Sequence, residues 1–237
     1  MVDETSPFHN LQIEDNPVLE VSAQEQSLQQ DLEQHMQHFR ALPDNSDPLE
    51  KARLMLDIAE CHLGLDQQQT AHDWAEQAFP ICLQQHAWQE AVDACDVIYN
   101  SNQQDAVVAL GNGIWLAVTF PIEANTSVQM LHHIVDETPD DSDGAAVAAM
   151  LAHYLAETRS DDKEHRNLTF VTNQVVAQVA KRHRNIDDDK TIQTWIKMYE
   201  LDQIDKLLPR MAAILDAIVG DNWWYDRDEI RSQLAIN

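Results

Sequence analysis

Apolar residues recur every three or four positions along almost the whole chain, with polar residues between them. In one run, Leu28, Leu32, Met36 and Phe39 stand among Gln, Glu and His, which predicts an amphipathic helix over about residues 21–40. The same pattern predicts helices over about 48–64, 67–84, 87–100, 103–119, 127–138, 144–158, 162–184, 189–200 and 203–219, and a short one from 227. Because neighbouring segments can merge, we expect an all-α fold of nine to eleven helices.

Helix start signals accompany these segments. Asp47, Pro48 and Glu50 combine an N-cap, a proline at the first helical position and an acid three residues after the cap. Similar pairs predict further starts: Asp66 with Gln69, Asn102 with Asp105, Thr126 with Gln129, Asp161 with Glu164 and Asp226 with Glu229. Two more caps are expected at Asp143 and within residues 187–189, where acids favour a helix N-terminus.

Turn residues are scarce. The chain has five glycines and eight prolines, too few for a β-rich fold, which needs a turn about every ten residues. The glycine-rich motifs GxGxxG, GxxxxGK[ST] and GxSxG do not occur. Phosphate-binding loops and serine nucleophile elbows of these kinds are therefore excluded.

Small residues recur with the same spacing in two consecutive stretches. The intervals are twelve and seven residues in both, and the second set is displaced by 35: Ala59, Ala71 and Ala78, then Ala94, Ala106 and Gly113. Such positions let antiparallel helices approach closely and stack in successive pairs. The stretch 48–119 therefore resembles tetratricopeptide-type repeats, whose unit is about 34 residues. The resemblance implies helical hairpins stacked as a solenoid; a generic helical-repeat bundle is the alternative.

Charge is unevenly distributed. The net charge is −26, from 41 acids and 15 bases. Between Leu54 and Thr158 there are sixteen Asp or Glu and no Lys or Arg, whereas the last 79 residues hold twelve of the fifteen bases. A phosphate backbone would be repelled, which argues against nucleic acid as a partner. The base-free stretch is consistent with a purely solubilising surface, or with a docking surface that binds a basic partner or pairs with the chain's own C-terminal third.

The chain divides into three parts by composition. Residues 1–20 are predicted to be a flexible acidic arm, 21–219 a single helical domain and 220–237 an aromatic segment with a short helix. The arm lacks the basic and apolar regions of a signal peptide, and three cysteines without a CxxC pair indicate a reducing compartment. We expect a cytoplasmic protein. The apolar stretch 106–122 contains Gly and Pro and predicts a buried helix, so no membrane association is expected.

Two groups of residues are candidates for partner binding. The first is acidic and precedes the predicted helix 144–158; the second is aromatic and follows Gly220, a predicted helix C-cap. Their members are Asp136, Glu137, Asp140 and Asp141, and Trp223, Trp224 and Tyr225. For the aromatic group, packing that fixes the terminal helix in place is the favoured role and a partner contact the second.

Histidines offer the one candidate metal site. His132, His133 and His153 each have a carboxylate four residues later, which gives at most two ligands on any one helix. HExxH is absent, and the acidic loop before Gly144 lacks the Glu that a calcium loop requires at its last position. No cofactor is predicted.

The sequence favours a non-catalytic protein-protein interaction module, acting as an adaptor, assembly factor or chaperone-like subunit through an acidic helical surface. Its partner is expected to be another protein, with self-association as the alternative. The alternative is an α-helical enzyme with a metal site built from the histidines named above and nearby carboxylates. Because fold-level analogy contributes much to the first interpretation, it is a hypothesis about function.

Overall fold

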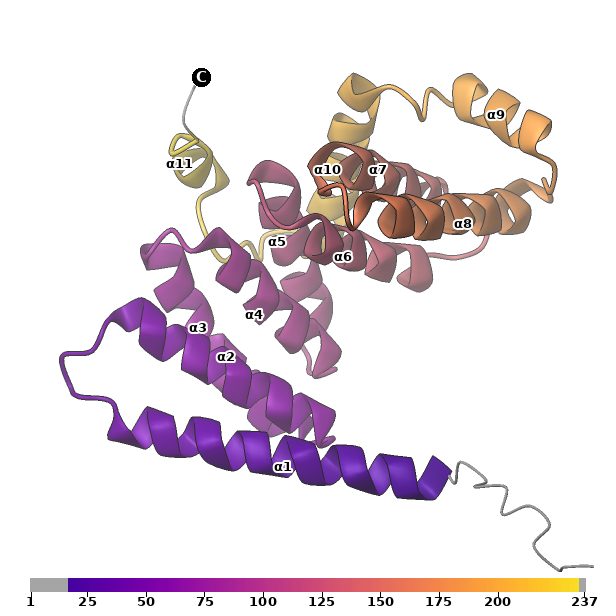
Figure 1. The fold of residues 1–237 in the computed structure, drawn as a ribbon. Coiled ribbons are helices and arrows are strands. Elements are labelled where there is room, and N and C mark those ends of the chain that lie inside the picture. Colours follow the sequence, from indigo (N-terminus) through magenta and orange to yellow (C-terminus); the bar gives the residue numbers. More distant parts are fainter. Residues whose placement is uncertain (1–16, 235–237) are drawn as a thin grey trace, which may run out of the picture.

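The computed structural model describes residues 17–234, with side chains from residue 23 onward. This part of the chain is all-α, as predicted, and contains eleven helices and no strand (Figure 1). The helices are α1 (Pro17–Ala41), α2 (Pro48–Gly64), α3 (Gln68–Gln84), α4 (Trp88–Asn100), α5 (Ala106–Thr119), α6 (Ala124–Glu137), α7 (Asp143–Arg159), α8 (His165–Arg184), α9 (Asp189–Met198), α10 (Ile204–Val219) and α11 (Arg227–Arg231).

The helices are stacked as hairpins in two layers. α2 packs on α3, α4 on α5 and α6 on α7, and α8 packs on α7 (Figure 1). α2, α4, α6 and α8 also contact one another in that order; we call them the first-helix layer, and α3, α5 and α7 the second-helix layer. α1 packs against α2, and α10 lies on α5 and α7 of the second-helix layer. The structure is thus a stack of helical hairpins with α10 across its second layer.

The small residues of the predicted repeat lie where helices meet. All six are buried: Ala59, Ala71, Ala78, Ala94, Ala106 and Gly113. A Cβ atom on Gly113 would lie 2.6 Å from the Cβ of Cys95 on α4 and 2.5 Å from the Cε of Met130 on α6. α5 therefore approaches α4 and α6 so closely at this position that no side chain fits without displacement.

Three predicted helix starts are confirmed by cap hydrogen bonds, and a fourth, at Asp161, lies in the turn before its helix. Asp47, Asp188 and Asp226 each accept from backbone N–H groups of the first turn of α2, α9 and α11. Asp161 accepts from the N–H groups of residues 163 and 164, although α8 itself begins at His165. Side-chain acceptors at these positions satisfy amide groups that have no partner within the helix.

Other predicted starts are wrong. Asp66 and Asn102 have left-handed backbones, with φ of 58° and 55°. They lie in the turns after α2 and α4, and they do not cap α3 and α5. Asp and Asn tolerate this conformation as well as the N-cap position, and their identity alone does not separate the two roles. Thr126 lies inside α6, which begins at Ala124. Ser142, one residue before the predicted Asp143, caps α7.

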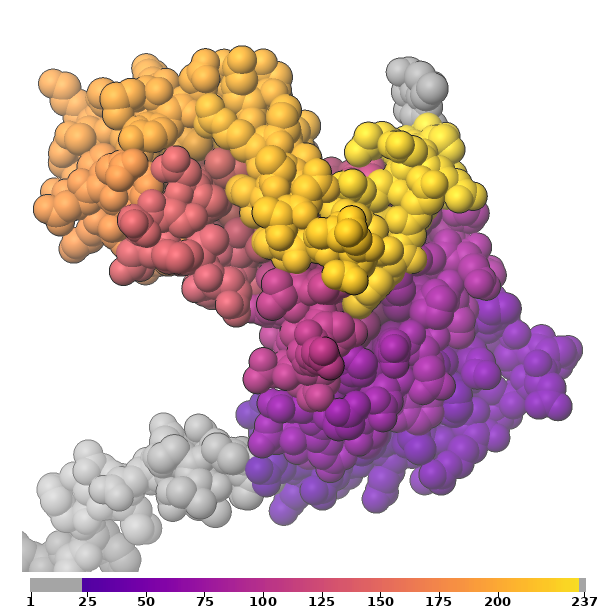
Figure 2. Space-filling view, turned by 180° about the vertical axis from the view of Figure 1, so that it is seen from behind, coloured from indigo at the N-terminus to yellow at the C-terminus, as the bar shows by residue number. Residues whose placement is uncertain are grey.

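The first helix begins earlier than predicted, and the last long helix ends where predicted. α1 begins at Pro17, so its first turn occupies the end of the predicted arm; residues 1–16 of that arm lie outside the described residues. Gly220 ends α10 with φ of 58°, as its predicted C-cap role requires. From there the chain crosses the second-helix layer; in Figure 2 it lies against the magenta part of the chain that contains α5.

The apolar stretch 106–122 is buried within the stack. It forms α5, whose residues from Ala109 to Ala117 are all buried. None of the described helices combines the length and apolar character needed to cross a membrane.

Two arginines from the base-rich third of the chain bond to helix carbonyls in the base-free part. Arg159 donates to the carbonyl oxygens of Ala117 and Val118 at the end of α5, at 2.6 and 3.0 Å. Arg182 donates to the carbonyl oxygen of Val135 near the end of α6, at 2.6 Å. A cation is favoured at these helix ends, because their carbonyl groups carry partial negative charge. Burial lowers the pKa of Arg159.

Candidate functional site

The predicted acidic residues lie at the end of α6 and in the loop after it. Asp136, Glu137, Asp140 and Asp141 are all exposed. Glu137 accepts a hydrogen bond of 2.8 Å from the hydroxyl of Tyr99 on α4. Burial and this bond raise the pKa of Tyr99 to about 12. These carboxylates are accessible to a partner, and one of them also links α6 to α4.

The predicted aromatic residues pack against the chain's own helices. The Tyr225 hydroxyl donates to the carbonyl oxygen of Asn112 at 2.6 Å, and the Trp224 backbone N–H donates to the Asn112 side-chain oxygen at 3.1 Å. The Trp224 ring meets Phe79 of α3 edge-on, with centroids 5.1 Å apart, and the Arg227 guanidinium lies 3.9 Å from the Trp223 ring centroid. All three aromatic residues are half-buried.

The two predicted groups are therefore on different layers. The acidic group belongs to α6 and its following loop, whereas the aromatic group rests on α3 and α5 of the second-helix layer. Burial of Tyr225 raises the pKa of its hydroxyl well above the usual value, because ionisation would place a charge in an apolar site. The structure does not assemble the two groups into one surface.

The three candidate metal-binding histidines point to separate neighbours. His133 Nε2 lies 3.0 Å from Asp96 of α4, His153 Nδ1 lies 2.9 Å from the Thr172 hydroxyl of α8, and His132 is exposed. Within residues 23–234, no three His, Cys, Asp or Glu side chains are grouped so as to hold a metal ion. The structure therefore does not bring these histidines together as one ligand set.

A group of carboxylates on α2 and α4 was not singled out from the sequence. We call it the acidic cluster; its members are Asp57 and Glu60 of α2, and Glu90, Asp93 and Asp96 of α4. Burial raises the pKa of Asp93 to about 7, with Glu60, Glu90 and Asp96 adding to the shift and a hydrogen bond from Gln89 opposing it. The pKa of Glu60 is also raised, mainly by burial and then by Asp57 and Asp96. Burial is thus the main cause of both raised pKa values, and the neighbouring carboxylates add to it.

Cations near the acidic cluster are few. Among the described residues, Arg53 is the one Lys or Arg that pairs with a member, through a bond of 2.6 Å from its Nε to Glu90. His35 lies 3.6 Å from Asp57, and His133 contacts Asp96 as described above. The first-helix layer thus presents net negative charge along α2 and α4.

Side-chain hydrogen bonds connect successive helices of this layer. We call these bonds the polar ladder, and they join residues 33 to 38 positions apart. They are Arg53–Glu90 from α2 to α4, and Gln89–Thr126, Asp96–Gln129, Asp96–His133 and Tyr99–Glu137 from α4 to α6. The separations match the 35-residue shift of the small residues, and this shift is the sequence signal that could have located the ladder.

No family model, curated protein or solved structure matches this chain. The likeness to tetratricopeptide repeats rests on the spacing of its own residues.

Proposed function

We propose that this chain is a non-catalytic protein-protein interaction module whose first-helix layer binds a basic surface of a partner. Such a role suits an adaptor, an assembly factor or a chaperone-like subunit. The tetratricopeptide-like arrangement would present α2, α4 and α6 as one continuous face. Their carboxylates would both attract and orient a cationic partner.

The acidic cluster is the observation that supports this proposal best. Among the five carboxylates, one pairs with an arginine, and burial, with smaller contributions from Glu60, Glu90 and Asp96, raises the pKa of Asp93 to about 7. Holding such charges together costs folding free energy, and a basic partner would offset that cost. Carboxylates that served solubility alone would be equally effective at any exposed position. They would not need to be partly buried, as Asp93 is.

Calorimetric titration with a Lys- and Ala-based helical peptide tests this proposal. We expect binding that weakens with salt, because exposed charges are screened over about 8 Å at physiological ionic strength. The triple variant Asp57→Asn/Glu60→Gln/Asp93→Asn should weaken binding by about tenfold at low salt. Binding by the parent should also be tighter at pH 8 than at pH 6, because Asp93 is ionised above its pKa of about 7.

A matched control removes the same number of charges elsewhere. Glu76, Asp162 and Asp202 are exposed and lie outside the acidic cluster, so their triple amide variant has the same net charge as the test variant. Equal weakening by the two variants would mean that the peptide senses overall charge, and the proposed face would be wrong.

A further inference from the structure

An apolar groove separates α6 from α8 in the first-helix layer. Its volume is about 580 Å³. Val128 of α6 forms one wall, Val171 and Val175 of α8 form the other, and Ala149 and Ala152 of α7 lie at its floor. Val171 is 47% exposed, which is unusual for a valine that faces a neighbouring helix. The groove is therefore an uncovered aliphatic surface.

The groove continues along α8 into a second hollow of about 430 Å³, and the two share His132 and Val135. Lys163 lines one end, and Lys181 and Arg182 line the other. At 1.5 Å per residue, the part of α8 from His165 to Arg182 is about 27 Å long, which matches about five turns of a helix.

The polar ladder does not extend into this groove. Among the described residues, the one hydrogen bond between α6 and α8 joins Arg182 to the carbonyl oxygen of Val135. It lies at the far end of the groove, and along the remaining length polar lining residues such as Gln129 and Asn167 form no hydrogen bond across it. α6 and α8 are therefore joined at one end and separated by the groove along the rest.

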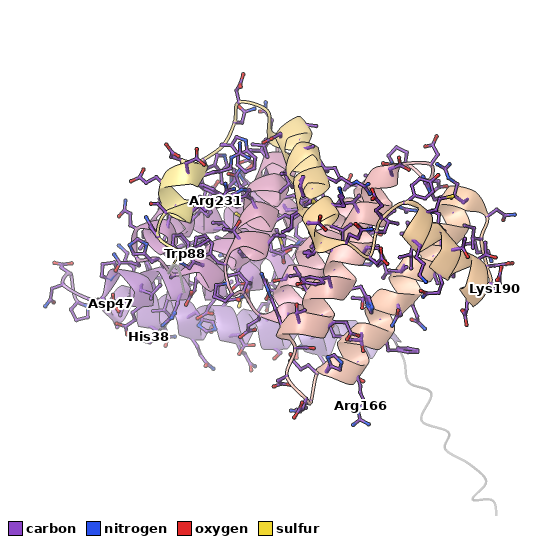
Figure 3. The ribbon with its side chains drawn as sticks, turned by 90° about the horizontal axis from the view of Figure 1, so that it is seen from above. His38, Asp47, Trp88, Arg166, Lys190 and Arg231 are labelled. Carbon is purple, nitrogen blue, oxygen red and sulfur yellow. The ribbon has the colours of Figure 1, made fainter. Side chains whose placement is uncertain are left out.

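The α8 wall is basic in a strongly acidic protein. Residues 165–184 contain Arg166, Lys181, Arg182 and Arg184 and no Asp or Glu. Figure 3 shows α8 at the edge of the molecule, with Arg166 directed outward. An apolar groove beside such a helix complements an apolar surface flanked by acids.

The other charged groups at the groove leave one end positive. Lys163 and Glu164 are adjacent and offset each other at the start of α8. On the α6 side, Asp136 lies 4.0 Å from His132, both near the end that Lys181 and Arg182 line. Two cations face one carboxylate there.

We propose that this groove binds an amphipathic helix of a partner protein, with an aliphatic stripe flanked by Asp or Glu. The stripe, at i, i+3 or i+4, and i+7, would cover the valines of α6 and α8, as in other helix-in-groove complexes. The acidic edge would lie beside Lys181 and Arg182. This site is separate from the acidic cluster, and it selects the opposite charge.

Two helical peptides of about 18 residues, matching the groove length, test the assignment against the full chain. Both carry the same leucine stripe; one has glutamates beside the stripe and the other has lysines. Fluorescence anisotropy should show binding of the glutamate peptide. Val171→Glu should weaken that binding by at least about tenfold, because it places an unpaired charge in an apolar contact. Lys181→Glu should weaken it by about tenfold through charge repulsion.

Neighbouring residues supply matched controls. Phe170 is 62% exposed and does not line the groove, so Phe170→Glu should leave binding unchanged. Lys190 lies in the first turn of α9 (Figure 3) and does not line the groove, and Lys190→Glu tests charge alone. The triple variant of the acidic cluster should bind the glutamate peptide at least as well as the parent, which separates failure of this proposal from failure of the proposed function.

Several results would overturn the assignment. One is that the glutamate peptide does not bind. A second is that Val171→Glu and Phe170→Glu weaken its binding equally. A third is that the lysine peptide binds and Val171→Glu abolishes that binding. A concentration-dependent dimer that Val171→Glu converts to a monomer would show that a second copy occupies the groove. Competition by a synthetic peptide of residues 1–16 would assign the groove to the chain's own N-terminal sequence.

Discussion

The contact between α4 and α6 differs from the contact between α6 and α8, although all three helices belong to one layer. The first is closed by side-chain bonds at Gln89, Asp96 and Tyr99, and by the close approach of α5 at Gly113. The second is an aliphatic groove with one bond at its end. The same stacking geometry thus produces a closed contact where side chains recur at the repeat shift, and an open groove where they do not.

We call the part of the stack around the α4–α6 contact the closed half, and the part around the α6–α8 groove the open half. The closed half is also covered by residues that follow α10. The C-terminal segment packs on α3 and α5 through Trp224 and Tyr225, whereas α8 has no such cover from residues 220–234. We therefore expect Trp224→Ala to lower the free energy of unfolding by about 2–4 kcal/mol. This is slightly less than for a fully buried tryptophan, because Trp224 is half-buried. Chemical denaturation measures this value. Phe170→Ala in the open half should change stability by no more than about 0.5 kcal/mol, and equal losses in both variants would remove the distinction.

Enlarging a small residue should cost more stability in the closed half than in the open half. Gly113→Ala forces a methyl group against Cys95 and Met130, and we expect a loss of about 1–3 kcal/mol. Ala152→Leu extends into the groove above α7, where space is present, so its cost should stay below about 1 kcal/mol. Thermal unfolding of the two variants provides the comparison. A larger loss for Ala152→Leu would mean that the groove closes in solution.

Asp93→Asn should stabilise the closed half in a pH-dependent manner. Folding raises the pKa of Asp93 from an ordinary value near 4 to about 7, so the folded state holds its proton more tightly and loses stability as the pH rises between these values. After a discount for partial exposure, the amide should gain about 1–2 kcal/mol at pH 8 and clearly less at pH 5. Melting curves at both pH values test this. Glu76→Gln, outside the acidic cluster, is the control, and a gain independent of pH would contradict the assignment.

The smallest effect is expected from one bond of the polar ladder. Tyr99→Phe removes the hydroxyl that donates to Glu137 and should cost about 0.5–1 kcal/mol. Tyr154→Phe changes an exposed tyrosine of α7 and should be neutral within about 0.5 kcal/mol. Urea unfolding with a common slope can resolve the difference. Identical midpoints for the two variants would show that this bond adds nothing to the closed contact.

Much of the fold could be predicted because it depends on periodicity. The eleven predicted segments correspond to the eleven described helices, and the small residues at the 35-residue shift are buried as expected. The starts assigned to Asp66 and Asn102 failed because a side chain that can cap a helix can also occupy a left-handed turn. Backbone conformation at such turns depends on how the two helices pack, which a single sequence does not specify.

The candidate sites were harder to predict. The base-free stretch indicated an acidic surface, but which carboxylates converge depends on the rotation of α2 against α4. Asp93 is unusual only because it is half-buried beside Glu60 and Asp96, and neither condition is visible in local sequence. The groove was missed for a related reason, since the valines of α8 have the spacing of any core-facing helix.

The bond between Asn112 and Tyr225 has a consequence for the order in which the chain folds. It joins residues 113 positions apart, whereas the ladder joins residues at most 38 apart. Closing the longer loop costs about 1 kcal/mol more in chain entropy, so the hairpins form first and the C-terminal segment docks late. The rings of Trp224 and Tyr225 lie 5.1 Å from Phe79 and 5.5 Å from Trp115, and on the ribosome these contacts are absent until residue 225 has been made. A nascent chain therefore exposes this apolar surface while the residues between Trp115 and Tyr225 are synthesised, and exposed apolar surface at this stage favours aggregation.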